Sequence, residues 1–332
     1  MSESRRIAVL GSNSFSGSDL VDLLLEDERN EVLGLSRSPE KGALFLPYKR
    51  HGSARFTFRQ MDMNRDMPQM LAALDEFRPR WIVNFAAQSE VGPSWEHPEH
   101  WFETNTVALA RFVNHMRRCD YLERYLHVSS PEAYGTCVGT VTEETPDNPS
   151  TPYAASKAAA DMLLGVYHRQ YGFPLLTVRS TNVYGAHQQL FKIIPRSVIY
   201  IKKGTTIQLH GGGRAVKSYI QIRDISRGEL AILDRGRVGE RYHLSPDRGV
   251  AVRDVVETIA RRMGKRLRDV TVDIEERPGQ DAAYVISSQK ARRELGWKPE
   301  VLLEEGLGEV VAWVEEYWEE IQRQPLEYEH KP

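Results

Sequence analysis

The sequence predicts an α/β fold in which a doubly wound parallel sheet is followed by a smaller mixed α/β C-terminal lobe. In the first two-thirds of the 332 residues, short apolar β-branched runs alternate with segments of helical period. That alternation is typical of strand–helix–strand units around a buried parallel sheet. The chain is also long for a single core, which favours two lobes.

The strands expected in the sheet share short apolar runs bounded by polar or turn residues. They are 5–11, 31–36, 55–61, 80–85, 124–129 and 174–180. Helical periodicity places the helices between them at 16–29, 66–77, 98–118 and 151–171. Six strands with crossover helices form a doubly wound sheet.

After Asn182 the pattern changes to short helices, glycine-rich turns such as Gly211-Gly212-Gly213, and isolated strands such as 241–244. We therefore expect the first lobe at 1–180 and the second at 181–332, with chain crossing back to the first around 215–250. A final amphipathic segment, 303–321, is expected to pack on the second lobe.

Composition limits the partners that this chain can bind. Lys and Arg number 44 against 46 Asp and Glu, a net charge of -2, so no overall field attracts nucleic acid or an anionic membrane. Cys119 and Cys137 lack a paired spacing, which argues against disulfides and zinc and fits a cytoplasmic protein without a signal peptide or membrane span. His97, His100 and His187 show no metal-ligand spacing, so no metal is predicted.

The first strand-to-helix turn has the composition of a dinucleotide site, which predicts a Rossmann-type fold. Glycines at such a turn let backbone amides at a helix N-terminus approach a pyrophosphate. Gly11 and Gly17 hold the first and last glycine positions, and Ser14 replaces the middle one. Two glycines at this spacing also occur in ordinary turns, so the position at the first strand carries the interpretation. The expected cofactor contacts here are Gly11, Asn13, Ser14, Phe15, Ser16 and Gly17.

Residues at the ends of later strands indicate which dinucleotide binds. An acidic residue after the second strand would bind the adenosine ribose, whereas an Arg there accepts a 2′-phosphate. Ser36-Arg37-Ser38 occupies that place, which favours NADP over NAD. Asp62 is placed to accept a hydrogen bond from the adenine amino group. The remaining expected contacts are Met63, Phe85, Ala86 and Ala87.

The segment Tyr153-Ala-Ala-Ser-Lys157 carries the strongest local chemical signal. Positions i and i+4 of a helix share a face, so we expect the Lys157 ammonium to lower the pKa of the Tyr153 phenol. Ser130 follows the fifth strand, where ligands bind in such sheets, and would donate to a substrate oxygen. The three residues form a triad that can remove a hydroxyl proton while a hydride leaves the same carbon.

With these motifs the chain resembles the extended short-chain dehydrogenases/reductases, and among them the nucleoside-diphosphate-sugar 4,6-dehydratases. The likeness includes both the GDP-mannose and the dTDP-glucose branches. It implies a lyase with a tightly bound, recycled nicotinamide cofactor and a dimer formed by helices 105–116 and 156–167. Further similar stretches are 84–89, 103–106, 179–188, 277–281 and 294–299.

The resemblance gives Glu132 a specific role. Related sugar 4-epimerases usually have a small residue there, whereas dehydratases use a carboxylate to remove the C5 proton after oxidation at C4. Water then leaves from C6, and the hydride returns to C6. The dTDP-glucose branch has an acidic Asp just before that Glu, but this chain has Pro131. We hypothesise that Glu132 both takes the C5 proton and protonates the departing hydroxyl.

On the substrate side, the resemblance assigns Asn182 to the diphosphate of a nucleotide sugar. Lys192 and Lys217 offer cations for the two phosphates, although relatives commonly have an Arg where Lys217 stands. Ser89 and Glu90 are expected to meet sugar hydroxyls, with Glu90 in place of the usual His.

The sequence leaves other activities open beside the preferred 4,6-dehydratase. A 4-epimerase is one, and a UDP-glucuronate-type decarboxylase is another, because decarboxylase relatives also keep a Glu in this loop. A 5,6-dehydratase that stops at the exocyclic alkene is a variant of the first hypothesis. A non-catalytic nucleotide-binding protein is disfavoured by the intact Ser130, Tyr153 and Lys157.

Overall fold

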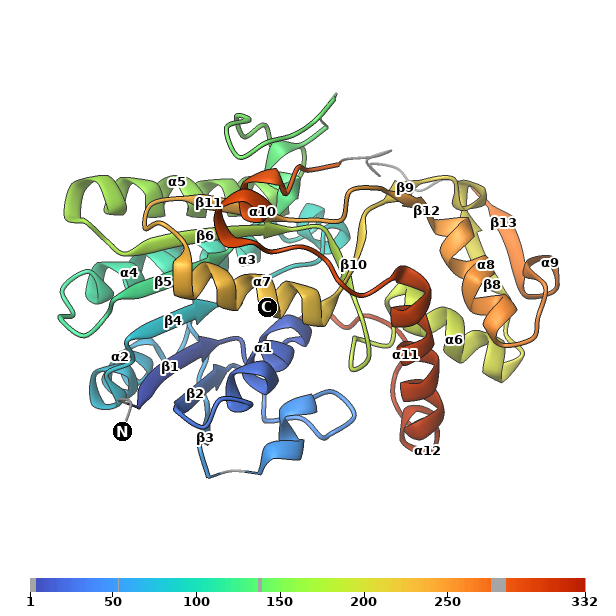
Figure 1. The fold of residues 1–332 in the computed structure, drawn as a ribbon, viewed down its shortest axis with the longest axis horizontal. Helices are drawn as coiled ribbons and strands as arrows, with labels where there is room; N and C mark the ends of the chain where they lie inside the picture. Colours follow the sequence, from blue (N-terminus) through green and yellow to red (C-terminus); the bar gives the residue numbers. More distant parts are fainter. Residues whose placement is uncertain (1–3, 53, 137–138, 276–284, 332) are drawn as a thin grey trace.

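The structure is a computed structural model that describes residues 4–52, 54–136, 139–275 and 285–331. Cys137 and the family-like stretch 277–281 lie outside these residues. The main feature is a seven-stranded sheet in the order β11-β6-β5-β4-β1-β2-β3, with every neighbouring pair parallel. This confirms the Rossmann-type doubly wound sheet (Figure 1). Its strands are β1 Arg5–Leu10, β2 Asn30–Ser36, β3 Phe56–Gln60, β4 Trp81–Asn84, β5 Arg124–Val128, β6 Leu175–Ser180 and β11 Arg241–Leu244.

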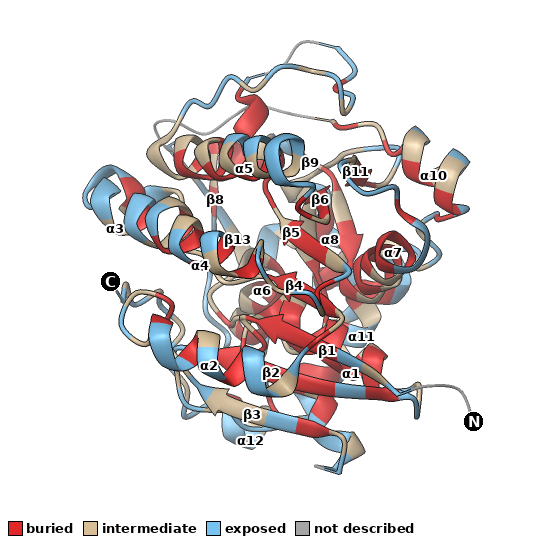
Figure 2. Ribbon diagram, turned by 90° about the vertical axis from the view of Figure 1, so that its left-hand side faces the viewer, coloured by how far each residue is buried: buried red, intermediate tan, exposed pale blue. Residues whose placement is uncertain are grey.

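Helices cover both faces of the sheet because alternate residues of each strand point to opposite faces. Ile7 and Val9 of β1 pack on the side of α1 and α7, whereas Ala8 and Leu10 pack on the side of α2, α4 and α5. Figure 2 shows the strands as a buried layer between these helices. The helices are α1 Phe15–Leu25, α2 Met67–Phe77, α3 Pro98–Phe102, α4 Leu109–Met116, α5 Pro152–Tyr171 and α7 Ile222–Arg235.

The helix expected over 98–118 is present, but its middle is wound differently. The segment η3, Glu103–Ala108, is π-helical and joins α3 to α4. Such π segments are rare and recur near functional sites. Here the extra backbone residue places Asn105 at the edge of the site described below.

One sequence-based interpretation was wrong. Residues 241–244 are not an isolated strand of the smaller lobe, because β11 pairs in parallel with β6 in the main sheet, Tyr242 opposite Val178. Tyr242, His243 and Leu244 are buried there. The chain returns through α7, which packs on α1. A four-residue strand has no local pattern that reveals its partner, so only the tertiary structure shows it.

The smaller lobe forms around a second core shared by three helices, α6, α8 and α11, which lie together beside the sheet (Figure 1). The helix expected over 303–321 is confirmed as α11 and α12, separated at Tyr317. Three short strand pairs, β7 with β10, β8 with β13 and β9 with β12, complete this lobe. The helices are α6 Ile193–Lys203, α8 Val252–Arg262, α9 Leu267–Val270, α10 Gln289–Leu295, α11 Leu303–Glu316 and α12 Trp318–Ile321. The strands are β7 Asn182–Tyr184, β8 Ile207–His210, β9 Val216–Lys217, β10 Tyr219–Gln221, β12 Val250–Ala251 and β13 Thr271–Ile274.

After α12 the chain returns to the carboxyl edge of the main sheet. The Lys331 carbonyl accepts hydrogen bonds from Arg37, after β2, and from Gln88, after β4. In Figure 2 the C-terminus accordingly lies on the side of α2 and β2. Among the described helices, none has the length and apolar character needed to cross a membrane.

Candidate active site

The turn between β1 and α1 has room only for glycine at two positions. Gly11 has a φ of +81°, and a Cβ there would lie 2.9 Å from the amide nitrogen of Ala86. A Cβ on Gly17 would overlap the carbonyl oxygen of Gly11. Ser14 caps α1, because its Oγ accepts a hydrogen bond from the Gly17 amide at 3.0 Å. The backbone can therefore approach a bound anion closely, as a pyrophosphate requires.

A cavity of about 240 Å³ opens at this turn. Its walls come from the carboxyl ends of β1 to β4, where ligands bind in doubly wound sheets. The glycine turn, the open helix N-terminus and the apolar walls fit a dinucleotide. The expected cofactor residues that line it are Gly11, Asn13, Ser14, Arg37, Asp62, Met63, Phe85, Ala86 and Ala87.

Three other expected contacts, Phe15, Ser16 and Gly17, do not line this cavity. Phe15 packs into the core of the α1 side with only 9% of its surface exposed. These residues form the first turn of α1, where the Gly17 amide already donates to Ser14. The sequence motif located the turn correctly but did not show which way its side chains face.

Lys41 lines the same cavity and was missed by the sequence analysis. Its ammonium donates to the Asn13 carbonyl at 3.0 Å, while the Asn13 side chain donates to the carbonyls of Ser38 and Pro39. The loop after β2 is thereby held against the dinucleotide turn. Burial, with a contribution from the charge of Lys331, lowers the pKa of Lys41. The only signal in the sequence was a second cation four residues after Arg37.

The catalytic groups meet at the end of β5. Ser130 caps the short turn η4, Pro131–Tyr134, by accepting a hydrogen bond from the Glu132 amide. Tyr153 lies in the first turn of α5 and is partly buried beside them. Burial raises the pKa of Tyr153 and the charge of Glu132 raises it further, whereas a hydrogen bond with Ser130 lowers it. The hydroxyl, carboxyl and phenol therefore share one site.

The ammonium of Lys157 is buried and points toward β5. It donates to the Val128 carbonyl at 2.8 Å and lies 3.4 Å from Nε2 of His127. Burial lowers the pKa of Lys157 to about 8, against the opposing charge of Asp161. The expectation that Lys157 would lower the pKa of Tyr153 is therefore wrong for this structure, because burial and Glu132 dominate at the phenol.

Behind Lys157 lies a buried ionic network that the sequence analysis did not identify. Asp161 accepts hydrogen bonds from Ser129 at 2.6 Å and from Arg179 at 2.5 Å. Burial alone would raise the pKa of Asp161, but Arg179 and then His127 hold it below its ordinary value. Asp161 follows Lys157 by four residues on α5, so helical spacing was the available signal.

Asn105 in the π-helical segment connects the two sides of the site. Its side chain accepts from the Gln88 amide at 2.9 Å and donates to the Gln88 carbonyl and to Ser156 Oγ. The loop after β4 is therefore fixed to α5 beside Lys157.

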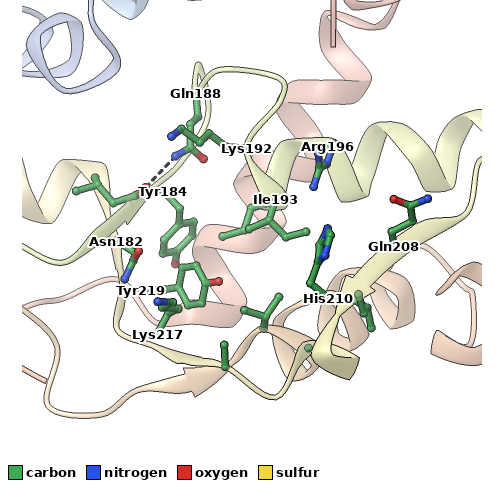
Figure 3. A pocket seen from close by; sticks show the side chains of 16 residues that line it. Asn182, Tyr184, Gln188, Lys192, Ile193, Arg196, Gln208, His210, Lys217 and Tyr219 are labelled. Carbon is green, nitrogen blue, oxygen red and sulfur yellow. Dashed lines mark hydrogen bonds between the residues drawn. The ribbon is translucent and has the colours of Figure 1, made fainter. Parts of the chain in front are cut away.

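A second cavity, of about 360 Å³, lies in the smaller lobe, between β7, β8, β10 and α6 (Figure 3). The expected substrate residues Asn182, Lys192 and Lys217 line it. The side-chain amide nitrogen of Asn182, Nδ2, is buried and has no hydrogen-bond partner among the described residues. Arg196 and His210 also line the cavity and were missed, although Arg196 follows Lys192 by one helical turn.

Two expected substrate residues contact each other instead of standing separately. Lys192 donates to Glu90 at 2.7 Å across the cleft between the lobes. The charge of Glu90 thus offsets the charge that Lys192 would offer to a phosphate. Ser89 is exposed and lines neither cavity.

Comparison with known proteins agrees with this geometry. A family model described as GDP-mannose 4,6 dehydratase matches residues 9–310. The chain belongs to this family. A dTDP-glucose 4,6-dehydratase of Xanthomonas campestris is 32% identical over 325 residues, covering 92% of each chain. One from Haemophilus influenzae is 27% identical over 328 residues, covering 92% of this chain and 97% of that one.

Solved structures show the same relationship. The dTDP-glucose 4,6-dehydratase of Streptomyces venezuelae, determined with NAD bound, has a TM-score of 0.86 and 30% identity, covering 94% of this chain and 97% of that one. A UDP-glucuronic acid 4-epimerase of Bacillus cereus, at 21% identity and a TM-score of 0.85, shares the fold alone. The predicted activity, a nucleotide-sugar 4,6-dehydratase with a nicotinamide cofactor, is confirmed at the level of the family.

The pKa of Lys157 predicts a pH dependence. We expect kcat/KM for water elimination to fall above about pH 8, because Lys157 loses its proton there. Asp161→Asn removes the charge that raises this pKa, so the basic limb should move down by about one pH unit. The pH profiles of both enzymes test this. Ser129→Ala keeps the charges of Lys157 and Asp161, so it should leave the basic limb of the profile in place. A wild-type kcat/KM that stays constant up to pH 9.5 would contradict the assignment of this limb to Lys157.

Proposed function

We propose that the chain eliminates water from C5 and C6 of a nucleoside-diphosphate sugar with Glu132 as both the base and the acid. The observation that carries this proposal is the shared site of Ser130, Glu132 and Tyr153, in which the carboxyl is close enough to raise the pKa of the phenol. Pro131 stands directly before Glu132. Its side chain has no proton to give, so the departing hydroxyl must be protonated by another group.

The roles of these side chains follow in order. When bound, a nicotinamide cofactor would supply the hydride acceptor for C4 and the hydride for C6. Ser130 donates a hydrogen bond to the C4 oxygen. Tyr153 takes the C4 hydroxyl proton as a phenolate, which the positive charge of an oxidised nicotinamide would favour against the raised pKa of the phenol in the cofactor-free chain. Glu132 then removes the C5 proton. The same carboxyl then protonates the leaving hydroxyl at C6.

The relatives point to the first substrate to test. The two curated relatives described above are named dTDP-glucose 4,6-dehydratases. We propose a nucleoside-diphosphate hexose of this kind, with its diphosphate near Asn182, Lys192 and Lys217. The unpartnered Asn182 amide supports this placement, because buried donors without partners are unfavourable unless a ligand satisfies them.

A Glu132→Gln variant tests the proposal. We expect its rate of water elimination to fall by about 10²-fold to 10⁴-fold, because the amide can neither take nor give the proton. Mass spectrometry of a nucleotide-sugar panel, dTDP-glucose and GDP-mannose first, would follow the loss of one water. Absorbance of the reduced nicotinamide should still appear, because oxidation at C4 does not need Glu132.

Glu144→Gln, at an exposed position in the following loop, is the matched control and should retain the wild-type rate. Elimination by Glu132→Gln at the wild-type rate would refute the role of Glu132. A wild-type product that is a C4 epimer, a pentose with carbon dioxide, or an exocyclic alkene would instead establish one of the alternative activities.

We further propose that NADP is preferred over NAD. Support comes from Arg37 and Lys41, two cations that line the cavity beside the end of β2, where no carboxylate stands in Ser36-Arg37-Ser38. The relative from Streptomyces venezuelae was determined with NAD, so this preference would be a difference between the two proteins.

Calorimetry with cofactor-stripped protein would measure the cofactor preference. We expect about tenfold tighter binding of NADP, and Arg37→Ala should remove most of that difference because charge-assisted hydrogen bonds to phosphate are among the stronger ones. Arg59→Ala, on the edge strand β3 and paired with Glu76, should change neither affinity. Tighter binding of NAD by the wild type would contradict the proposal.

We also propose a cytoplasmic homodimer. Helix α5 and segment η3 present the apolar residues Met162, Val166 and Val107 to solvent, with exposed fractions of 61%, 50% and 38%. Contiguous exposed apolar surface marks interaction sites. The cytoplasmic part rests on a sequence with only two cysteines.

Sedimentation of the wild type and of Met162→Glu tests the dimer. We expect a dimer for the first and a monomer for the second, because a buried unpaired carboxylate disfavours the interface. Val272→Glu, an exposed apolar position on β13 of the smaller lobe, should remain dimeric. A monomeric wild type at micromolar concentration would refute the proposal.

A further inference from the structure

The C-terminal segment Leu326–Lys331 reaches the carboxyl edge of the sheet beside the cofactor cavity. Its last described carbonyl, of Lys331, accepts from Arg37 at 3.1 Å and from Gln88 at 2.6 Å. Arg37 lines the cofactor cavity, and Gln88 lies two residues before Glu90, which contacts Lys192 of the substrate cavity. The backbone of the segment therefore joins the loops that follow β2 and β4.

His330 attaches this segment to the start of α3 through stacked rings. Its imidazole stacks on buried Trp101 with centroids 5.1 Å apart and planes 10° apart. It also stacks on His97 at 5.7 Å and on His100 at 5.3 Å. His97, His100 and His330 therefore lie together. Their spacing along the sequence did not indicate this, because His330 is far from the other two.

Two of these histidines and one carboxylate form a set of metal-binding donors. The available ligand atoms of His97, Glu99 and His100 all lie within 4.8 Å of one another. Glu99 Oε1 is 3.8 Å from His97 Nδ1 and 3.7 Å from His100 Nε2. Two imidazoles with one carboxylate are a recurrent zinc ligand set that leaves a fourth position open.

The side chains have the freedom to close around an ion. His97, Glu99 and His100 are 49%, 66% and 30% exposed, so small rotations toward ligand distances of about 2.0–2.2 Å disturb little packing. Imidazole and carboxylate donors suit zinc and its neighbours among the divalent transition metals.

The hydrogen bonds of His330 fit the role of an outer partner of such a site. His100 Nδ1 and His330 Nε2 are 3.0 Å apart, and His330 Nδ1 lies 3.2 Å from the Tyr328 hydroxyl. If Nε2 of His100 binds the ion, its Nδ1 carries the proton and donates to His330. The Nδ1–H of His330 then donates to the Tyr328 oxygen. Metal-bound histidines are usually oriented by a partner at the other ring nitrogen.

We propose that His97, Glu99 and His100 bind a divalent transition metal ion, with zinc as the reference, and that His330 links this ion to the C-terminal segment. With the ion bound, His100 donates a hydrogen bond to His330, and His330 donates one to Tyr328. The ion thereby holds Leu326–Lys331 in place beside the cofactor cavity, against Arg37 and Gln88. Metal binding and ordering of this segment are in this way coupled.

A second group of donors in the structure provides a matched control. Asp75, His115 and Cys119 also lie within 4.8 Å of one another, on α2 and at the end of α4. Asp75 already accepts from Tyr121 at 2.8 Å and contacts His115 at 2.9 Å. Within the described part of the chain, the contacts of this group do not include the C-terminal segment, so a His115→Ala variant separates the two sites.

Calorimetric titration of the full-length, untagged protein with zinc chloride tests the proposal, with cobalt absorption as a second readout of coordination. We expect His100→Ala to weaken the site by more than about 100-fold and His330→Ala by about 10-fold to 100-fold, the usual effect of losing an outer partner. His115→Ala should bind as the wild type does. Binding is measured without substrate, so failure of the proposed function would not affect the result.

Trypsin cleavage after exposed Arg323 measures how firmly the C-terminal segment is held. Zinc should slow release of the segment after Arg323 by at least about tenfold in the wild type, and not in His330→Ala, because only the wild type couples the ion to the segment. Three outcomes would overturn the proposal: no zinc binding at 100 µM, binding that His115→Ala removes and His100→Ala keeps, or identical zinc affinity in His330→Ala.

Discussion

The hydrogen bond from the Lys157 ammonium to the Val128 carbonyl ties the catalytic helix to the centre of the sheet. It fixes α5 against the end of β5, so that Tyr153, one turn earlier, faces Ser130 and Glu132. A buried ammonium is costly unless it is paired and hydrogen-bonded. Asp161 supplies the opposite charge, and Arg179 in turn balances Asp161. The site therefore depends on a charge network that never reaches the substrate cavity.

The structure places two opposing charges where the lobes meet. Glu90 comes from the loop after β4, and Lys192 precedes α6 of the smaller lobe. A diphosphate that takes hydrogen bonds from Lys192 must compete with Glu90. The pair therefore links substrate binding to the contact between lobes, and it also influences catalysis because the charge of Glu90 raises the pKa of Tyr153.

The C-terminal segment brings the end of the chain to the dinucleotide lobe. Its contacts with Arg37, Gln88 and Trp101 all lie near the carboxyl edge of the sheet. Residues from both ends of the chain therefore meet beside the cofactor cavity, which Arg37 lines.

The sequence by itself determined the features that depend on short-range patterns. Strand and helix periodicity identified β1 to β6 and most of the helices around them. The two glycine positions after the first strand identified the turn at Gly11 and Gly17. The four-residue spacing on a helix identified Tyr153 and Lys157. These signals are local because backbone geometry repeats over two to four residues.

Only the tertiary structure decided which distant groups meet. The pairing of β11 with β6, the contact of Lys192 with Glu90, and the gathering of His97, His100 and His330 join segments far apart in sequence. The pKa of Tyr153 belongs to the same class, because burial and the charge of Glu132 raise it. Burial and electrostatic interactions act through space, so no spacing along the chain records them.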